Sequence, residues 1–251
     1  MSMEKVKEIN RRFHELMLED VKEGIFDEGA YFWHYEPFSA GYWDQKHKIV
    51  LCNLETHGES TTGSYEDRIL TFEPFKTWVE HGYQTIKRSA LFLYALCQKF
   101  QGNSLTNDQL RGMYRKNDEL LRGIKNTAYM NWRKEEGEWV PENTENIYRF
   151  LVPGWSLSPD AEISNEKYRK LTLEYIDALE PDIFVVTGKT GWDVLKKIYE
   201  GKVNLPWQGM SRNGKTLFIS AYHPSRAMSY QYILEKTSSI YKAFSGEKVH
   251  G

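Results

Sequence analysis

The ten residues LFISAYHPSR, at positions 217–226, decide how the chain is expected to fold. Residues 217–221 are an apolar run of strand-forming residues, which predicts a buried strand. His223 precedes a proline, and that position favours extended or turn angles. Residues 226–236 then have the apolar spacing of a helix. Open α/β sheets place ligand chemistry at the carboxyl ends of buried strands, so His223 is a candidate functional residue, although an ordinary turn would also suit it.

Three further segments predict buried strands, at residues 48–53, 127–131 and 183–187. Helical spacing predicts helices over residues 4–24, 77–100, 107–123, 162–179 and 191–199. The alternation predicts an α/β fold, with a mainly parallel four-stranded sheet covered on both faces by helices.

We expect a single domain spanning residues 1–251. Its α/β core is predicted to span residues 45–236, and residues 1–44 add an N-terminal helix and an aromatic cover segment. The rings of this cover are either core or the wall of a ligand site, and core is the favoured interpretation.

The composition excludes several classes of protein. The 251 residues are 40% hydrophobic and 27% charged, which is typical of a soluble globular protein. No apolar run approaches the ~20 residues that span a bilayer, and the charged N-terminus lacks an apolar signal segment, so the expected compartment is the cytoplasm. The two cysteines, Cys52 and Cys97, cannot form a four-cysteine cluster. A formal charge of −2 does not mark a nucleic-acid binder, although a local basic face can exist within a balanced total.

Catalytic motifs of several common enzyme classes are missing. Residues 187–190, TGKT, resemble the end of a phosphate-binding loop, but Ile183 stands where that loop needs its first glycine. The chain has no nucleophile elbow and no His-Glu-x-x-His pair. We therefore expect no metal and no cofactor.

Polar residues close three of the expected strands. Asn53, with Glu55 and His57 nearby, follows the first strand, Asn131 closes the second, and His223 follows the last. Because the carboxyl ends of parallel strands meet at one edge of a sheet, the three are expected to line one pocket.

At these positions the chain resembles the uracil-DNA glycosylase superfamily over roughly residues 45–236. His223-Pro224-Ser225 is similar to the family's His-Pro-Ser motif. Residues 51–55, LCNLE, occupy the place of the family's Gly-x-(Asp/Asn)-Pro motif, with Leu51 and Leu54 where its glycine and proline would stand. Asn131 matches the asparagine that reads the uracil edge. The resemblance implies a three-layer α/β/α sandwich.

The resemblance also implies roles for individual residues. His223 would stabilise the departing base, and Asn53 or Glu55 would position or activate water. Asn131 would bind the base, Tyr65 would stack on it, and Met228 or Arg226 would act as a wedge in the DNA duplex. Cys52 and Ser225 are expected at the substrate as members of the two motifs.

The function implied is that of a monofunctional hydrolase that removes uracil or a related base from single-stranded or mismatched duplex DNA. The alternative is a catalytically weak or inactive member that binds a small nucleobase ligand, a nucleotide or a nucleic acid. A third possibility is an unrelated α/β enzyme whose polar strand ends merely cap loops. Basic residues around the pocket, with Lys46, Lys48, Lys189, Arg212 and Arg226 as candidates, would favour DNA. A monomer without membrane association is expected.

Overall fold

A computed structural model of the protein describes residues 3–23, 34–35, 39–53, 69–70, 72–131, 159–199, 209–224 and 228–246. Its centre is a five-stranded sheet with the order β4-β2-β5-β7-β6. The four expected strands are confirmed as β2 (Ile49–Asn53), β4 (Ala128–Asn131), β5 (Ile183–Thr187) and β7 (Thr216–Ala221). They are parallel to one another. Strands β2 and β5 are buried at every position, as expected for parallel strands covered on both faces.

The expected count of four strands is wrong, because β6 (Met210–Asn213) adds a fifth. It pairs antiparallel with β7 at the edge of the sheet, and Asn213 is the partner of Thr216 across a two-residue turn. Gly214 has a φ of 57°, which suits the first position of such a turn. Strand β6 lacks the apolar run by which buried strands are recognised, since its side chains are half-buried or exposed. Gly214, as the first residue of the two-residue turn Gly214-Lys215, was the available sequence signal.

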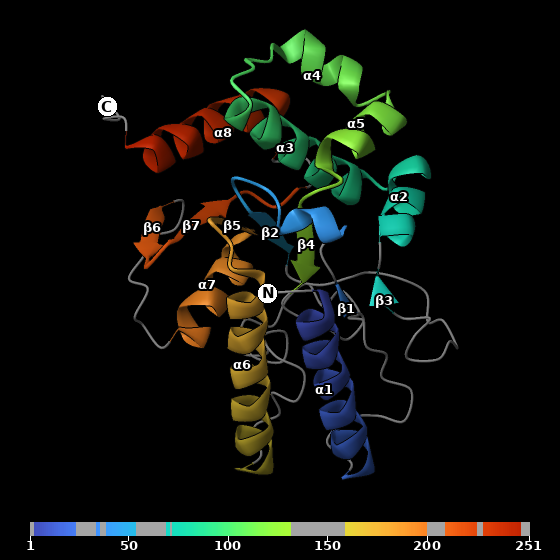
Figure 1. Cartoon of the computed structure of the whole chain (residues 1–251), viewed down its shortest axis with the longest axis vertical. Coiled ribbons are helices and arrows are strands. Elements are labelled where there is room, and N and C mark those ends of the chain that lie inside the picture. Colours follow the sequence, from blue (N-terminus) through green and yellow to red (C-terminus); the bar gives the residue numbers. More distant parts are fainter. Residues whose placement is uncertain are drawn as a thin grey trace.

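Helices lie on both sides of the sheet, which is consistent with a three-layer arrangement (Figure 1). One side carries α3 (Gln84–Phe100) and α8 (Tyr230–Ser245), with α2 (Phe72–Glu80), α4 (Asn107–Met113) and α5 (Asn117–Ile124) around them. The other side carries α6 (Pro159–Leu179), α7 (Lys189–Ile198) and α1 (Met3–Lys22). A separate two-stranded parallel sheet joins β1 (His34–Tyr35) to β3 (Ile69–Leu70), and a 3-10 helix spans Ala40–Tyr42.

Three expected helices have different boundaries. The helix expected over residues 77–100 is two helices, since Gly82 has a φ of 80° and ends the first of them. The helix expected over residues 107–123 divides into α4 and α5 around residues 114–116, which contain neither glycine nor proline. The last helix begins at Tyr230 rather than 226, because the Ser229 hydroxyl accepts a hydrogen bond from the Tyr232 amide and caps it.

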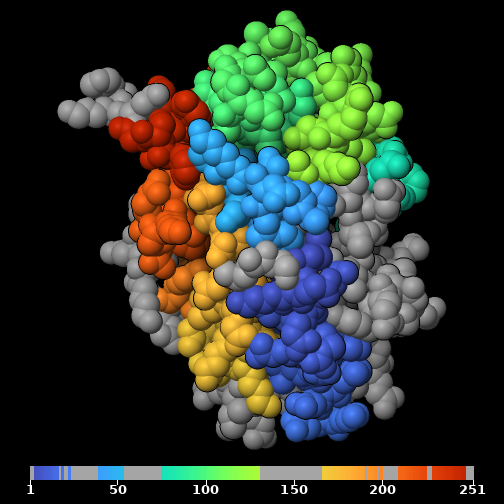
Figure 2. Space-filling view, viewed as in Figure 1, coloured from blue at the N-terminus to red at the C-terminus, as the bar shows by residue number. Residues whose placement is uncertain are grey.

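The described N-terminal elements share the core of the sheet. Helix α1 contributes Val6, Ile9, Phe13 and Leu16 to the same continuous cluster of buried apolar side chains. Residues 39–53 lie between α1 and the helices of the opposite side (Figure 2). Tyr42 is fully buried, and its hydroxyl donates to the Leu179 carbonyl oxygen at 3.1 Å. Tyr42 is therefore a core residue and not a ligand wall.

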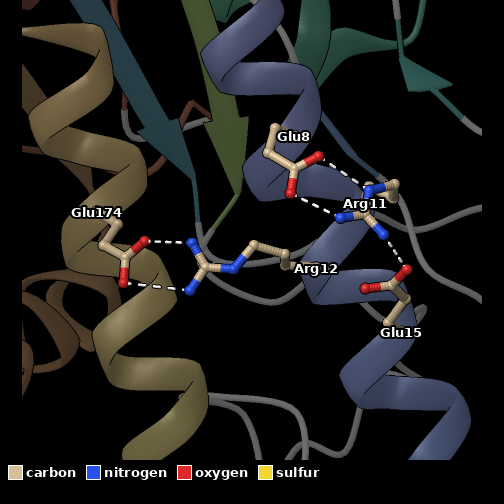
Figure 3. Close-up of polar contacts among 5 residues, drawn as sticks. All are labelled: Glu8, Arg11, Arg12, Glu15 and Glu174. Carbon is tan, nitrogen blue, oxygen red and sulfur yellow. Dashed lines mark hydrogen bonds and ion pairs between the residues drawn. The ribbon is translucent and has the colours of Figure 1, made fainter.

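Helix α1 is also joined to α6 by a surface ion pair. Both terminal nitrogens of the Arg12 guanidinium group face the Glu174 carboxylate, while Arg11 bonds Glu8 and Glu15 along its own helix (Figure 3). The side chains of Arg12 and Glu174 are 42% and 46% exposed, so the pair contributes less than the apolar contacts beneath it. None of the helices in the described ranges combines the length and apolar character needed to span a bilayer.

Candidate functional site

The candidate site is the edge of the sheet where the four parallel strands end. Asn53 and Asn131 are register partners on β2 and β4, and Thr187 and Ala221 are partners on β5 and β7. From β2 the chain crosses to β4 on one side, and from β4 it returns to β5 on the other side of β2. The order of the strands therefore reverses between β2 and β5. Open α/β sheets bind their ligands in the crevice at such a point.

Asn53 lies at this point, in a closed set of hydrogen bonds. Its side chain is 3% exposed. The amide nitrogen donates to the Tyr129 hydroxyl and, at 3.4 Å, to the Ser89 hydroxyl of α3. The amide oxygen accepts from the Thr187 hydroxyl of β5. Both N–H groups and one oxygen lone pair are thus taken by the protein, which leaves this amide one acceptor position for a ligand or water.

The same network fixes Tyr129 as a neutral hydrogen-bonding group. Burial raises the pKa of Tyr129 well above its ordinary value, and the hydrogen bonds with Asn53 and Ser89 only partly offset that rise. Ser89 in turn donates to the Thr85 carbonyl oxygen at 3.0 Å. Strands β2, β4 and β5 and helix α3 are therefore joined by hydrogen bonds between side chains near the strand ends.

His223 is exposed and lies two residues beyond the end of β7. Its side chain lies above Gly188: a Cβ added at Gly188 would be 3.7 Å from the His223 Cδ2 atom. Gly188 has a φ of 77°, which only glycine adopts readily, and its amide donates to the Ala221 carbonyl oxygen at 2.9 Å. The end of β5 is thus bare of side chains beneath the imidazole.

The segment that carries His223 is anchored to helix α8. The Tyr222 amide donates to the Tyr232 hydroxyl at 2.9 Å, and the two rings lie 4.6 Å apart. Burial raises the pKa of Tyr232 to about 12, so its hydroxyl is a neutral partner at physiological pH. The position of His223 is therefore determined by α8 as well as by β7.

The other expected site residues divide into three groups. Asn131 is the last residue of β4, at the same edge as Asn53. Cys52 and Met228 are 0% and 1% exposed and belong to the core, so neither side chain is accessible to a substrate, and Met228 is unavailable as a duplex wedge. Four positions lie outside the described residues: Glu55, Tyr65, Ser225 and Arg226.

Only one of the described basic candidates lies at this edge. Lys189 is the exposed first residue of α7, directly after Gly188. Lys46 and Lys48 precede β2 and so lie at the opposite, amino-terminal edge. Arg212 is paired with Leu217 near the start of β7, and its guanidinium lies over the Phe244 ring. The expected basic rim is therefore reduced to Lys189 among these four.

Sequence reasoning missed the residues that hold Asn53. Thr187 is the last residue of its strand run, Tyr129 lies inside one, and Ser89 follows Lys87 and Arg88 at the start of an apolar helical run, so no shared sequence pattern marks the three. The register of β2 with β4 and β5 is what brings them together.

No protein-family model and no curated protein matches the chain. Among the described residues, no group of three or more histidine, cysteine, aspartate or glutamate side chains is arranged to hold a metal ion.

Proposed function

We propose that the protein is a monofunctional, metal-free glycosylase of the uracil-DNA glycosylase type, which hydrolyses the N-glycosidic bond of uracil or a related base in DNA. The observation that carries the proposal is the position of Asn53, Asn131 and His223 at or just beyond strand ends along one edge of a single sheet. Helices on both sides of that sheet are consistent with the α/β/α sandwich of this type of enzyme.

The spacing of the strand ends suits a single base. Neighbouring strands lie about 4.8 Å apart, so β7 is about 10 Å from β2 and about 14 Å from β4. A pyrimidine ring with one side chain reaching it from each side fits that span. Gly188, after the end of β5, has no side chain, and the His223 side chain lies within van der Waals distance of the position that a Cβ would take there.

Each of the two outer residues has the chemistry that uracil requires. Uracil presents an N3–H donor beside an O4 acceptor, and the amide of Asn131 complements both. Cytosine presents the opposite pattern, so a fixed amide would reject it. Cleavage of the glycosidic bond moves negative charge onto the departing base. A hydrogen bond from His223 to O2 would stabilise that charge. Removal of such a donor typically raises the activation free energy by about 3–4 kcal/mol.

The third requirement, activation of water, is the weakest in this chain. Asn53 has no basic group, and its amide has one acceptor position left after its bonds to Tyr129, Ser89 and Thr187. General-base catalysis contributes typically about 10²–10⁴-fold, so without it the rate would be modest. Glu55 is the carboxylate assigned to this step as general base.

The same observation favours a second candidate function. If Asn53 serves only to hold strands β2, β4 and β5 together, it does not activate water. Asn131 and His223 would then still bind a base, but the base would not be released by hydrolysis. The protein would then be a binding module for a free base, a nucleotide or a nucleic-acid end.

The test is release of uracil from a labelled single-stranded oligonucleotide that contains one uracil. We expect His223→Ala and Asn131→Ala each to lower the rate about 10²–10³-fold, the loss typical of removing one preorganised donor. His81→Ala and Asn103→Ala are matched controls, since both side chains are exposed and neither lies at a strand end.

The outcomes separate the candidates. Release that depends on both residues supports the glycosylase, and a duplex substrate then measures strand preference. No release at excess protein rules out uracil excision. Binding of the oligonucleotide that still requires Asn131 would then support the binding module.

A further inference from the structure

Two cations and two tyrosines form a cluster on the surface where α3, α4 and α8 meet. The Lys87 ammonium lies 4.7 Å from the centre of the Tyr114 ring, and the Arg111 guanidinium carbon lies 6.0 Å from that of Tyr230. The two rings are 6.3 Å apart, in an edge-to-face arrangement. Lys87, Arg111, Tyr114 and Tyr230 are called here the cation–aromatic patch.

No carboxylate of the described residues pairs with the cations of this patch. Within that part of the chain neither Lys87 nor Arg111 has a carboxylate partner, in contrast to Lys116, which pairs with Glu119 at 3.1 Å. A cation held by a carboxylate is neutralised, whereas a cation held over a ring is positioned and keeps its charge. Arg115, the residue after Tyr114, is also an exposed cation, and it has no ion pair among the described residues. An anion that reaches this surface meets cations that are already in place.

Hydrogen bonds fix the elements that carry the patch. The Asn107 amide of α4 donates to the Gln231 side chain of α8 at 2.9 Å. The Arg88 guanidinium of α3 donates to the Met228 carbonyl oxygen at 2.7 Å, just before α8. Lys87 and Tyr230 therefore keep their places relative to α4, and the patch is part of the rigid structure.

The patch lies next to the candidate site. Tyr230 and Tyr232 are two residues apart on α8, so they project to nearly opposite sides of its first turn. Tyr232 contacts Tyr222, the neighbour of His223, while Tyr230 belongs to the patch and contacts Tyr114. The separation is about one helix diameter, roughly 10 Å. A strand with about 3.4 Å per nucleotide crosses that distance in about three nucleotides.

We infer that the cation–aromatic patch binds the phosphate backbone of a nucleic-acid strand that passes over the start of α8 to the His223 edge. The inference rests on the proposed function for its choice of partner, because unpaired cations at this distance from a base pocket match the spacing of a polynucleotide. The patch is a local region of positive charge in a protein whose formal net charge is −2.

The experiment measures binding without excision, so the patch and the glycosylase proposal can fail separately. The probe is a fluorescein-labelled, uracil-free 20-mer of oligothymidylate, titrated with the full chain at 50 to 300 mM salt. The logarithm of the binding constant falls linearly with the logarithm of the salt concentration, and each lost phosphate contact makes this fall less steep by about 0.7 for a single strand. Lys87→Gln with Arg111→Gln should therefore reduce the slope by about 1.4 and weaken binding at 50 mM salt at least tenfold.

Matched controls test the location. Lys167→Gln with Lys215→Gln removes the same charge from exposed positions on α6 and the β6–β7 turn, and it should leave the slope unchanged. Lys87→Arg should restore wild-type binding. The inference is overturned if both double variants lose binding equally, or if the native chain does not bind the oligonucleotide. It is also overturned if polyglutamate displaces the labelled oligonucleotide as well as unlabelled oligothymidylate does. If uracil release persists while the patch variants bind normally, the glycosylase stands and the patch does not.

Discussion

Asn53 has a structural role at a position that the proposed function assigns to the site. A buried amide without partners costs about 1–3 kcal/mol, so its bonds to Tyr129, Ser89 and Thr187 are required for stability. The same bonds hold the ends of three strands in one arrangement. A residue that a motif assigns to water is therefore also the residue that orders the edge.

Thr187→Val should destabilise the protein by about 1–3 kcal/mol, because it leaves the Asn53 amide oxygen without its donor in a buried site. Thr237→Val is the matched control. Thr237 is also buried, but its hydroxyl donates to the Ile233 carbonyl oxygen within α8, which already accepts a helical bond, so its loss should cost under about 0.5 kcal/mol. Urea unfolding of both variants measures the difference, and equal losses would mean that the Asn53 network adds nothing.

Lys236 should make stability depend on pH. It is 8% exposed on α8, and burial lowers its pKa from 10.5 to about 8. Between pH 8 and 10.5 the unfolded chain binds the proton and the native state does not, so stability rises with pH, by up to about 3 kcal/mol. Above pH 10 the trend reverses, because buried Tyr42 and Tyr129 have raised pKa values and hold their protons only in the native state.

The measurement is urea unfolding at intervals from pH 7 to 9.5. Lys236→Met should abolish the rise, while Lys242→Met, at an exposed position on the same helix, should retain it. If the free energy of unfolding still rises with pH in Lys236→Met, the rise comes from another titrating group.

At the scale of elements, the contact between α3 and α5 depends on a missing side chain. A Cβ added at Gly123 would lie 2.4 Å from the Cδ2 atom of the buried Tyr94 ring, whereas nothing lies within 4 Å of one added at Gly112 in α4. Gly123→Ala should therefore destabilise the protein by about 1–3 kcal/mol through overpacking. Gly112→Ala should stabilise it by up to about 1 kcal/mol, because alanine favours the helix.

Thermal unfolding of the two glycine variants gives the comparison directly. Opposite shifts of the midpoint are expected from the same substitution. A rise in both would show that α5 moves away from Tyr94 at little cost.

The elements differ in how far the sequence predicts them, for physical reasons. The four parallel strands were predictable because burial on both faces makes them continuous apolar runs. Strand β6 was not, since one half-exposed edge strand has no such run. The position of His223 just beyond the end of β7 was predictable, because it follows an apolar strand run. The partners of Asn53 were not, because Thr187, Tyr129 and Ser89 meet only through strand register and helix packing.

At the scale of the whole molecule, the question is whether α1 is an added layer or part of one cooperative unit. Its buried residues belong to the same apolar cluster as the sheet, and the ring of Phe13 stacks on Tyr168 of α6 at 6.3 Å. An independent layer would contribute little to the stability of the remaining structure. A shared core predicts that α1 unfolds together with the sheet.

Phe13→Ala should therefore lower the stability of the entire protein by about 3–5 kcal/mol, the cost of a cavity left by a buried aromatic ring. Far-ultraviolet circular dichroism and tryptophan fluorescence should shift together, since both follow one transition. Arg12→Ala, one residue earlier, removes only the exposed pair with Glu174 and should cost under about 1 kcal/mol. If Phe13→Ala separates the two probes into two transitions, α1 is a layer that unfolds alone, and the candidate site does not depend on it for stability.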